Sequence, residues 1–154
     1  MKKGVAAVGG TFDRLHDGHR ALILEAFRLG ERVVVGLTSD LFVKTAGKTG
    51  VAPYKERRRS LSHFLTSSGL AERATVMKIE DRFGPTTEDQ AISSIVVTKE
   101  TYGTAVEANQ LRVARGTKPM KIRVVDMVLA KDKLPISSSR IRGGEIDEHG
   151  NQAN

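Results

Sequence analysis

Gly9-Gly10-Thr11-Phe12-Asp13-Arg14-Leu15-His16-Asp17-Gly18-His19 is the stretch of sequence that decides the fold of this chain. It follows the apolar run 4–8, which predicts a buried strand, and it ends where a helical pattern opens at Asp17. Paired glycines let a backbone turn sharply and come close to a ligand. The start of a helix offers free N–H groups and a positive dipole end, which favour an anion. His16 and His19 add donors that can carry positive charge near pH 7. The stretch therefore predicts a phosphate-binding site.

Strand and helix patterns alternate along the rest of the chain. Because they are separated by helical patterns of roughly ten to fifteen residues, the strands imply right-handed crossovers and a parallel sheet. Asp17 is the expected N-cap of the first helix and Gly30 its end. The predicted strands are 4–8, 32–37, 74–79, a segment within 92–98, and 121–127; the predicted helices are 17–29, 54–67, 101–115 and a short one within 136–142. The expected fold class is α/β, a single doubly wound domain over 1–154 with a five-stranded parallel sheet, and 145–154 is expected to form a frayed tail.

Composition narrows the class of protein. The chain has 154 residues, which suits one domain, and it has no cysteine, so disulfides and thiolate catalysis are excluded. No apolar run reaches the length of a membrane span, so we expect a cytoplasmic protein without membrane contact. The net charge of +7 suits a polyphosphate substrate. A nucleic-acid partner is not favoured, because the basic residues are scattered and aromatic residues make up only 5% of the chain. Oligomeric partners are left open.

Two further motifs are weak evidence for a metal site and for a second phosphate-binding site. Either His16 or His19 could simply cap the helix, and this alternative is left open. The pair could also suggest zinc, but the Glu of a metalloprotease helix and a nearby third ligand are absent, so no protein-bound metal is expected. Gly47-Lys48-Thr49 looks like the end of a phosphate-binding P-loop. That motif needs a glycine where Phe42 stands and a helix at once, whereas the next helix begins only near Pro53. We interpret this segment as a mobile loop without a phosphate-binding role.

The segment Ile136-Ser137-Ser138-Ser139-Arg140-Ile141-Arg142 is more informative. Three hydroxyls before a helix can cap its start, which is one explanation for them. A cap needs only one hydroxyl, however. The remaining hydroxyls, the helix N–H groups and Arg140 together suit a polyphosphate.

Two of these segments carry a resemblance to a known family. Gly10-Thr11-Phe12-Asp13 with His16-Asp17-Gly18-His19 resembles the nucleotidyltransferase superfamily marked by an HxGH signature, and 136–142 resembles its second signature. Within that superfamily the chain is most similar to the archaeal type of phosphopantetheine adenylyltransferase, through 97–101 followed by Gly103, Asn109 and Arg112. Archaeal flavin adenylyltransferases have similar first loops and are the nearest alternative. A non-catalytic nucleotide- or RNA-binding module is a third possibility.

The resemblance implies a Rossmann-like fold and an activity. An enzyme of this type transfers the adenylyl group of ATP to 4′-phosphopantetheine, giving dephospho-coenzyme A and pyrophosphate, with Mg²⁺ carried by the ATP phosphates. His19, His16 and Lys44 would be catalytic, and Thr11, Lys44 and Arg58 would bind the acceptor. Exposed surface positions are the alternative for Lys44 and Arg58, and a satisfied buried amide is the alternative for Asn109. The residues implied to bind ATP are Gly9, Gly10, Thr11, Phe12, His16, His19, Thr98, Glu100, Ser137, Ser138, Ser139 and Arg140.

Overall fold

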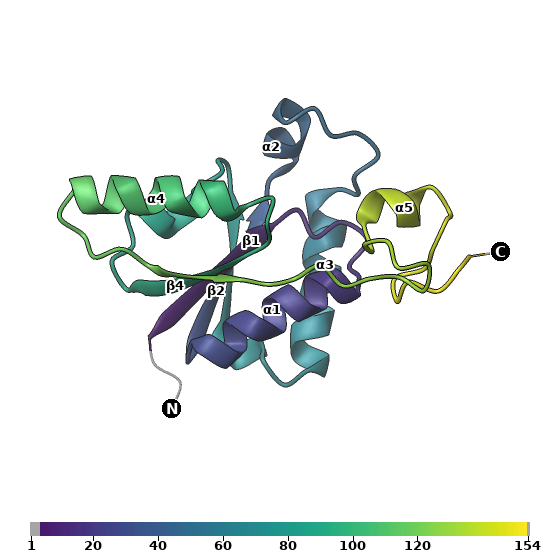
Figure 1. The fold of residues 1–154 in the computed structure, drawn as a ribbon, viewed down its shortest axis with the longest axis horizontal. Helices are drawn as coiled ribbons and strands as arrows, with labels where there is room; N and C mark the ends of the chain where they lie inside the picture. Colours follow the sequence, from purple (N-terminus) through teal and green to yellow (C-terminus); the bar gives the residue numbers. More distant parts are fainter. Residues whose placement is uncertain (1–3, 154) are drawn as a thin grey trace.

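A five-stranded parallel sheet forms the centre of the molecule in the computed structural model, which describes residues 4–153 (Figure 1). Its spatial order is β3-β2-β1-β4-β5. The strands are β1 (Val5–Gly10), β2 (Arg32–Thr38), β3 (Ala74–Ile79), β4 (Ile92–Val97) and β5 (Lys121–Val124). The predicted α/β class with a parallel five-stranded sheet is confirmed.

Helices cover both faces of the sheet (Figure 1). On one face lie α1 (Asp17–Leu29) and α3 (Tyr54–Ser67), and on the other lies α4 (Tyr102–Ala114). Two shorter helices, α2 (Asp40–Thr45) and α5 (Ser138–Arg142), and the 3₁₀ turns η1 (Ala71–Arg73) and η2 (Gly84–Thr87) complete the chain. The bounds of α1, α3 and β3 are those predicted, whereas α2 was not predicted as a helix.

The core follows from the alternation of side chains along buried strands. Ala6 and Val8 of β1 face α1 and α3, where they join Ile23 and Leu61, while Ala7 faces α4 and joins Ala108. Both faces of a central strand are therefore apolar. This explains why β1 and β2 are continuous apolar runs in the sequence.

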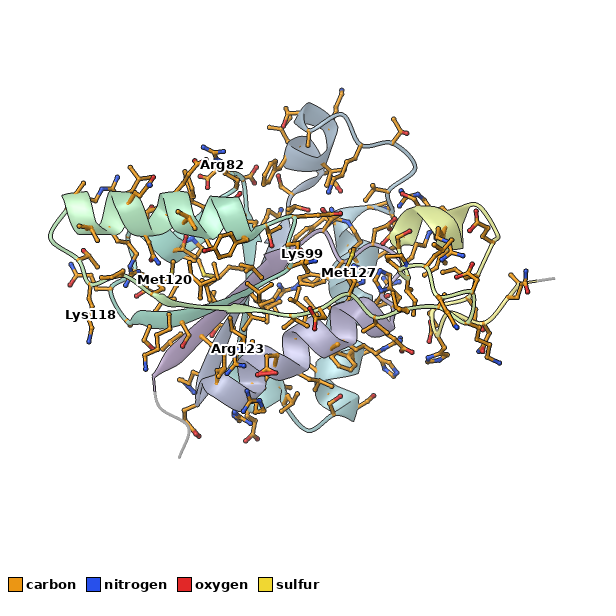
Figure 2. The ribbon with its side chains drawn as sticks, viewed as in Figure 1. Arg82, Lys99, Lys118, Met120, Arg123 and Met127 are labelled. Carbon is orange, nitrogen blue, oxygen red and sulfur yellow. The ribbon has the colours of Figure 1, made fainter. Side chains whose placement is uncertain are left out.

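Two polar side chains of α4 serve the fold. Arg112 is buried and donates to four backbone carbonyls, those of Thr86, Asp89, Ile92 and Lys118. Asn109 exchanges two hydrogen bonds with the backbone of Met120, at the end of the sheet opposite α5 (Figure 2). Asn109 is therefore a satisfied amide, the alternative that the sequence left open.

Two predicted regions differ from the structure. The fifth strand ends at Val124, and the chain then runs as an extended segment toward α5. The expectation of a frayed tail is wrong for 145–153, because Ile146 is only 4% exposed and packs with Ala130 and Ile136. Residue 154 lies outside the described residues. The sequence-based expectation failed because it considered only the polarity of the tail, and a single apolar residue anchors it.

The helices of residues 4–153 include none that combines the length and the apolar character needed to cross a membrane.

Candidate active site

The site lies where the strand order reverses, between β1 and β4. The chain leaves β1 toward α1 and leaves β4 toward α4, and these helices lie on opposite faces of the sheet, so a crevice opens at the carboxyl ends of the two strands. Lys99, just after β4, and Met127, on the segment leading to α5, both lie near the middle of the molecule, on the side of the sheet toward α5 (Figure 2). The sequence placed the ligand at this rim, and cavities are found there.

The start of α1 is capped by its two histidines. His16 is the N-cap, and its Nδ1 accepts hydrogen bonds from the N–H groups of Gly18 (3.1 Å) and His19 (3.3 Å). In return, Nδ1 of His19 accepts from the N–H of His16 at 3.3 Å. The predicted N-cap at Asp17 is therefore wrong by one residue, because an imidazole acceptor replaces the carboxylate. A Cβ on Gly18 would lie 2.9 Å from the His16 ring, so only glycine fits beneath it.

Both imidazoles are neutral at pH 7. Burial, and then the charge of Arg20, lowers the pKa of His16 to about 4. Burial, followed by the charges of His16 and Arg20, lowers the pKa of His19 to about 3. The rings stack with centroids 3.7 Å apart. Because each Nδ1 accepts a hydrogen bond, the proton of each neutral ring is assigned to Nε2. The histidines are therefore neutral donors, which corrects the expectation of positive charge.

The first N–H groups of α1 are occupied. Those of Gly18 and His19 bind Nδ1 of His16, and that of Arg20 binds the His16 carbonyl at 3.0 Å. The N–H of Asp17 donates to the carbonyl of Glu148 at 3.0 Å. The expectation that this helix start offers free amides to a phosphate is therefore wrong. At the start of α1, donors to a phosphate must therefore come from side chains.

A cavity of about 520 Å³ adjoins the histidines, and we call it the polar cavity. Its wall includes Lys48, Asp126 and Arg142 in addition to predicted residues. Phe12 lies in this wall with a positive φ of 48°, a conformation that costs a non-glycine residue on the order of 1 kcal/mol. Its ring contacts His19 edge-on, with centroids 5.3 Å apart. The predicted nucleotide-binding residues that line this cavity are Thr11, Phe12, His16, His19, Thr98, Glu100, Ser137, Ser138 and Ser139.

The three serines have different local partners. Ser137 caps α5 by accepting from the N–H of Arg140 at 3.3 Å. The hydroxyl of Ser138 donates to the carbonyl of Asp13, and that of Ser139 accepts from Nη2 of Arg142 at 3.3 Å. Ser137 is thus the helix cap, which is the role that the sequence analysis gave as one explanation for the three hydroxyls. The other two connect the motif to the residues around it.

The arginine that lines the polar cavity is Arg142 and not the predicted Arg140. Carboxylates of Asp132 and Glu145 hold the Arg140 guanidinium outside the cavity wall. Arg142 lies in the wall and pairs with Asp13, whose side chain is only 2% exposed. The two arginines are two positions apart on a short helix, so they point to different sides of it.

Asp13 joins three segments of the chain. Its carboxylate pairs with Arg142 of α5 and accepts from the N–H of Ala52 at 3.0 Å, and its carbonyl accepts from Ser138. The first motif, the loop before α3 and the second motif therefore meet at one buried residue. Its backbone neighbours Phe12 and Arg14 both have positive φ.

A second cavity, of about 230 Å³, shares Thr11 and Lys48 with the polar cavity. We call it the apolar cavity, because Val34, Ile79 and Ile95 are among the side chains that line it. It lies on the face of the sheet that carries α4, and η2 covers part of it. Gly9 and Gly10, predicted to bind ATP, line this cavity and are absent from the wall of the polar one.

Lys48 occupies the junction of the two cavities. Its Nζ donates to Oγ1 of Thr11 at 3.2 Å. Lys44, the predicted catalytic lysine, is exposed in the last turn of α2 and lines neither cavity. The cation at the junction of the two cavities therefore belongs to the Gly47-Lys48-Thr49 loop, which the sequence analysis had interpreted as having no phosphate-binding role. The resemblance of this loop to a P-loop was the signal in the sequence that could have identified Lys48, although the loop lacks the first glycine and the immediate helix of that motif.

The sequence expects one of Arg57 and Arg58 on the core-facing side of α3 and assigns acceptor binding to Arg58. The structure shows that Arg57 is the one that reaches the first motif. Arg57 is 2% exposed and donates to the carbonyl of Thr11 at 3.0 Å and to that of Ala52 at 2.8 Å. It also forms an ion pair with Asp40 at 3.1 Å. Arg58 is exposed and lines neither cavity. Arg57 thus supports the backbone beside Thr11, since its donors are taken up by protein groups.

Comparison with known proteins identifies the class. The family model described as cytidylyltransferase-like matches residues 7–144, a range that contains both motifs and all residues that line the two cavities. The chain belongs to this family.

Curated relatives narrow the class further. The chain is 49% identical to the phosphopantetheine adenylyltransferase of Methanopyrus kandleri over 141 residues, which are 92% of this chain and 89% of that protein. It is 46% identical to the enzyme of the same name from Methanothermobacter thermautotrophicus, over 97% of this chain and 89% of the relative. Among solved structures, a protein of unknown function from Archaeoglobus fulgidus superposes with a TM-score of 0.72 at 30% identity, covering 89% of this chain and all of that one.

Proposed function

We propose that this protein transfers the adenylyl group of ATP to 4′-phosphopantetheine, giving dephospho-coenzyme A and pyrophosphate. The similarity to named phosphopantetheine adenylyltransferases over nearly the full chain supports this function. One structural observation carries the proposal: a polar and an apolar cavity meet at Thr11 and Lys48. Two adjoining cavities suit a reaction between a polyphosphate and a phosphate that is carried on a long, slender arm.

The polar cavity suits ATP. His16 and His19, as neutral donors, line the same cavity as Ser137, Ser139 and Arg142, and Arg142 donates to the Ser139 hydroxyl. Such mixed neutral and charged donors are what a triphosphate requires. Thr98 and Glu100, at the end of β4, complete the wall on the side away from α5.

The apolar cavity suits the acceptor. Its mouth carries the Thr11 hydroxyl and the Lys48 ammonium, which can bind the acceptor phosphate. Its interior is lined by β1, β2 and β4 on one side and by Thr104 and Ala105 of α4 on the other. The pantetheine arm is slender, and its methylene and dimethyl groups suit this lining. Because Gly9, Gly10 and Gly36 carry no side chains, they leave space for a ligand above the strands that line the cavity.

The reaction needs alignment and charge stabilisation and does not need a protein nucleophile. The acceptor phosphate oxygen attacks the α-phosphorus of ATP, and the bond to the β-phosphate oxygen breaks to release pyrophosphate. His19 and Lys48, which line the polar cavity, would stabilise the charge that builds on the α-phosphate oxygens. Arg57 holds the backbone carbonyl of Thr11 and so fixes the point where the two substrates meet.

Mg²⁺ would enter with the triphosphate. Residues 4–153 contain no group of three or more His, Asp or Glu side chains arranged to hold a metal ion. The carboxylates of Glu100 and Asp126 line the polar cavity, where they would accept hydrogen bonds from water molecules bound to the ion. The ion would then take its oxygens chiefly from phosphate and water, and it would offset the charge of the triphosphate.

The acceptor is tested directly with purified protein, ATP and Mg²⁺. We expect pyrophosphate release, with dephospho-coenzyme A detected by mass spectrometry, when 4′-phosphopantetheine is the acceptor and background release with flavin mononucleotide. Flavin adenine dinucleotide as the faster product would contradict the proposal. ATP binding without turnover of either acceptor would indicate a non-catalytic nucleotide-binding module.

The junction is tested by a matched pair of lysine variants. Lys48→Ala should lower kcat by roughly 10²-fold, since it removes one donor from the transferring phosphate. Lys44→Ala removes an equal charge four positions earlier and should change kcat less than about twofold. Steady-state kinetics with both substrates measures the two effects. The reverse ranking would place the catalytic lysine on α2.

A further inference from the structure

The C-terminal segment 145–153, which we call the C-terminal clamp, is fastened to both halves of the polar cavity. It forms an antiparallel bridge between Ile146 and Gln152 around a turn organised by Asp147. The N–H groups of His149 and Asn151 donate to that carboxylate, and the bonds from Asn151 help to lower the pKa of Asp147. The turn is therefore an ordered element with partners of its own.

One side of the clamp binds the start of α1. The carbonyl of Glu148 accepts the N–H of Asp17 at 3.0 Å, and its carboxylate pairs with Arg20 at 3.1 Å. Arg20 also pairs with Asp17 at 2.8 Å, and His149 lies 3.0 Å from the same carboxylate. These contacts lie next to both histidines, because Asp17 follows His16 and Arg20 follows His19 in the sequence. The ion pairs are exposed, so each contributes little stability, but together they fix a position.

The other side of the clamp binds the segment that leads into the second motif. The N–H of Lys131 donates to the carbonyl of Gly150 at 3.0 Å. Ile146 is buried with Ala130 and Ile136, and Ile136 immediately precedes Ser137. Gly150 has a φ of +80°, and a Cβ there would lie 2.7 Å from Cα of Ala130 and 2.9 Å from Cδ1 of Ile136. The contact is therefore too close for any residue but glycine.

We propose that the C-terminal clamp sets the separation between the histidines and the serines, and that Glu148 and Gly150 are positioning residues for adenylyl transfer. The inference rests on the proposed function. The two motifs are more than 110 positions apart in the chain, and the residues of α5 that contact the first motif do so through side chains at Asp13. The clamp adds a second attachment on the far side of His16. Two attachments fix both the distance and the angle between the motifs, whereas one leaves a hinge.

Two pairs of variants test the clamp. Glu148→Gln removes the carboxylate charge that holds Arg20, and Glu25→Gln removes a comparable exposed ion pair on the same helix. Gly150→Ala forces the clamp away from Ala130, while Gly116→Ala places a methyl at a similar φ of +79° with no atom within 4 Å. Both variants therefore place alanine in a left-handed backbone conformation at a similar cost in stability, but only Gly150→Ala displaces the clamp.

We expect Gly150→Ala to lower kcat roughly tenfold, and Glu148→Gln by less, because small misplacements of aligned groups are costly in rate. The Kd of ATP should change less than about threefold, and Gly116→Ala and Glu25→Gln should keep the wild-type kcat. Equal losses in both members of each pair, or losses that track only the melting temperature, would overturn the proposal.

Hydrogen exchange tests the same point without turnover. In the unliganded protein, Gly150→Ala should speed amide exchange in 136–142 while the strands of the sheet keep their protection. Unchanged exchange in 136–142 would overturn the clamp even if activity fell. If the wild-type protein forms no dephospho-coenzyme A, the proposed function fails, and the exchange data still decide whether the clamp exists.

Discussion

The two motifs of the polar cavity are held in contrasting ways. The first motif largely satisfies itself: His16 and His19 cap their own helix, and the backbone bonds lie within four residues of one another. The second motif has one local cap, at Ser137, and otherwise depends on Asp13 and on the C-terminal clamp. A helix as short as α5 has little stability of its own, so its orientation must come from tertiary contacts.

This difference separates the tasks of the two motifs. A self-capped helix start holds neutral imidazoles at a fixed place whether or not ligand is bound. The position of α5 comes instead from its contacts with Asp13 and with the C-terminal clamp. We expect the first motif to act in the transition state and the second to bind the substrate and release pyrophosphate.

The strongest way to test this division is His19→Ala. Removal of one preorganised donor should lower kcat by roughly 10²- to 10³-fold, with little change in ATP affinity. Single-turnover kinetics with saturating ATP measures the chemical step, and calorimetry measures binding. A large loss of ATP affinity with unchanged kcat would assign the first motif to binding instead.

Acid should destabilise the first motif in a definite pH window. The folded pKa values of about 4 and 3 lie below the unfolded value of 6.5, so the unfolded chain takes up protons first as the pH falls. Above pH 6.5 the two histidines contribute nothing to the pH dependence. Below it, each should lower the free energy of unfolding by about 1.4 kcal/mol per pH unit until its folded pKa is reached.

His16→Asn isolates this effect, because asparagine can still cap the helix but does not titrate. Urea unfolding at pH 7 and pH 5 should show a smaller loss of stability in the variant, by on the order of 2 kcal/mol. An identical pH dependence in the two proteins would mean that His16 is not held neutral by the fold.

The smallest expected effect separates the two arginines of the second motif. Arg142→Gln should weaken ATP and pyrophosphate binding roughly tenfold, which is the order of one charged hydrogen bond. Arg140→Gln removes a guanidinium already paired with Asp132 and Glu145, so the affinity should change less than about twofold. Calorimetric titration of each variant decides which arginine faces the nucleotide.

Three cations show how far the sequence could predict the site. For the two arginine pairs the sequence selected the right segment and a neighbouring residue, Arg58 beside Arg57 and Arg140 near Arg142. For the lysine it selected Lys44 and set aside the loop that contains Lys48. Segments follow from apolar periodicity, which the chain displays clearly. Which side of a short helix or loop faces a cavity depends on how that element is rotated, and packing against distant residues sets the rotation.

The cap of α1 and the C-terminal tail also depend on packing against distant residues. Asp17 is a standard N-cap, and only the burial that makes His16 neutral lets an imidazole take its place. The polar tail contains one Ile and one Gly whose roles appear only beside Ala130 and Ile136. Neither contact has a local signature in the sequence.

By itself, the sequence determined the α/β class, the bounds of α1, α3 and β3, and the two motifs that mark the site, because each follows from local periodicity and residue type. Only the tertiary structure decided that the histidines are neutral, that Lys48 and Arg142 line the cavities, and that the tail connects both motifs. Charge states and side-chain directions depend on burial and on partners far apart in the chain, and those exist only once the chain has folded.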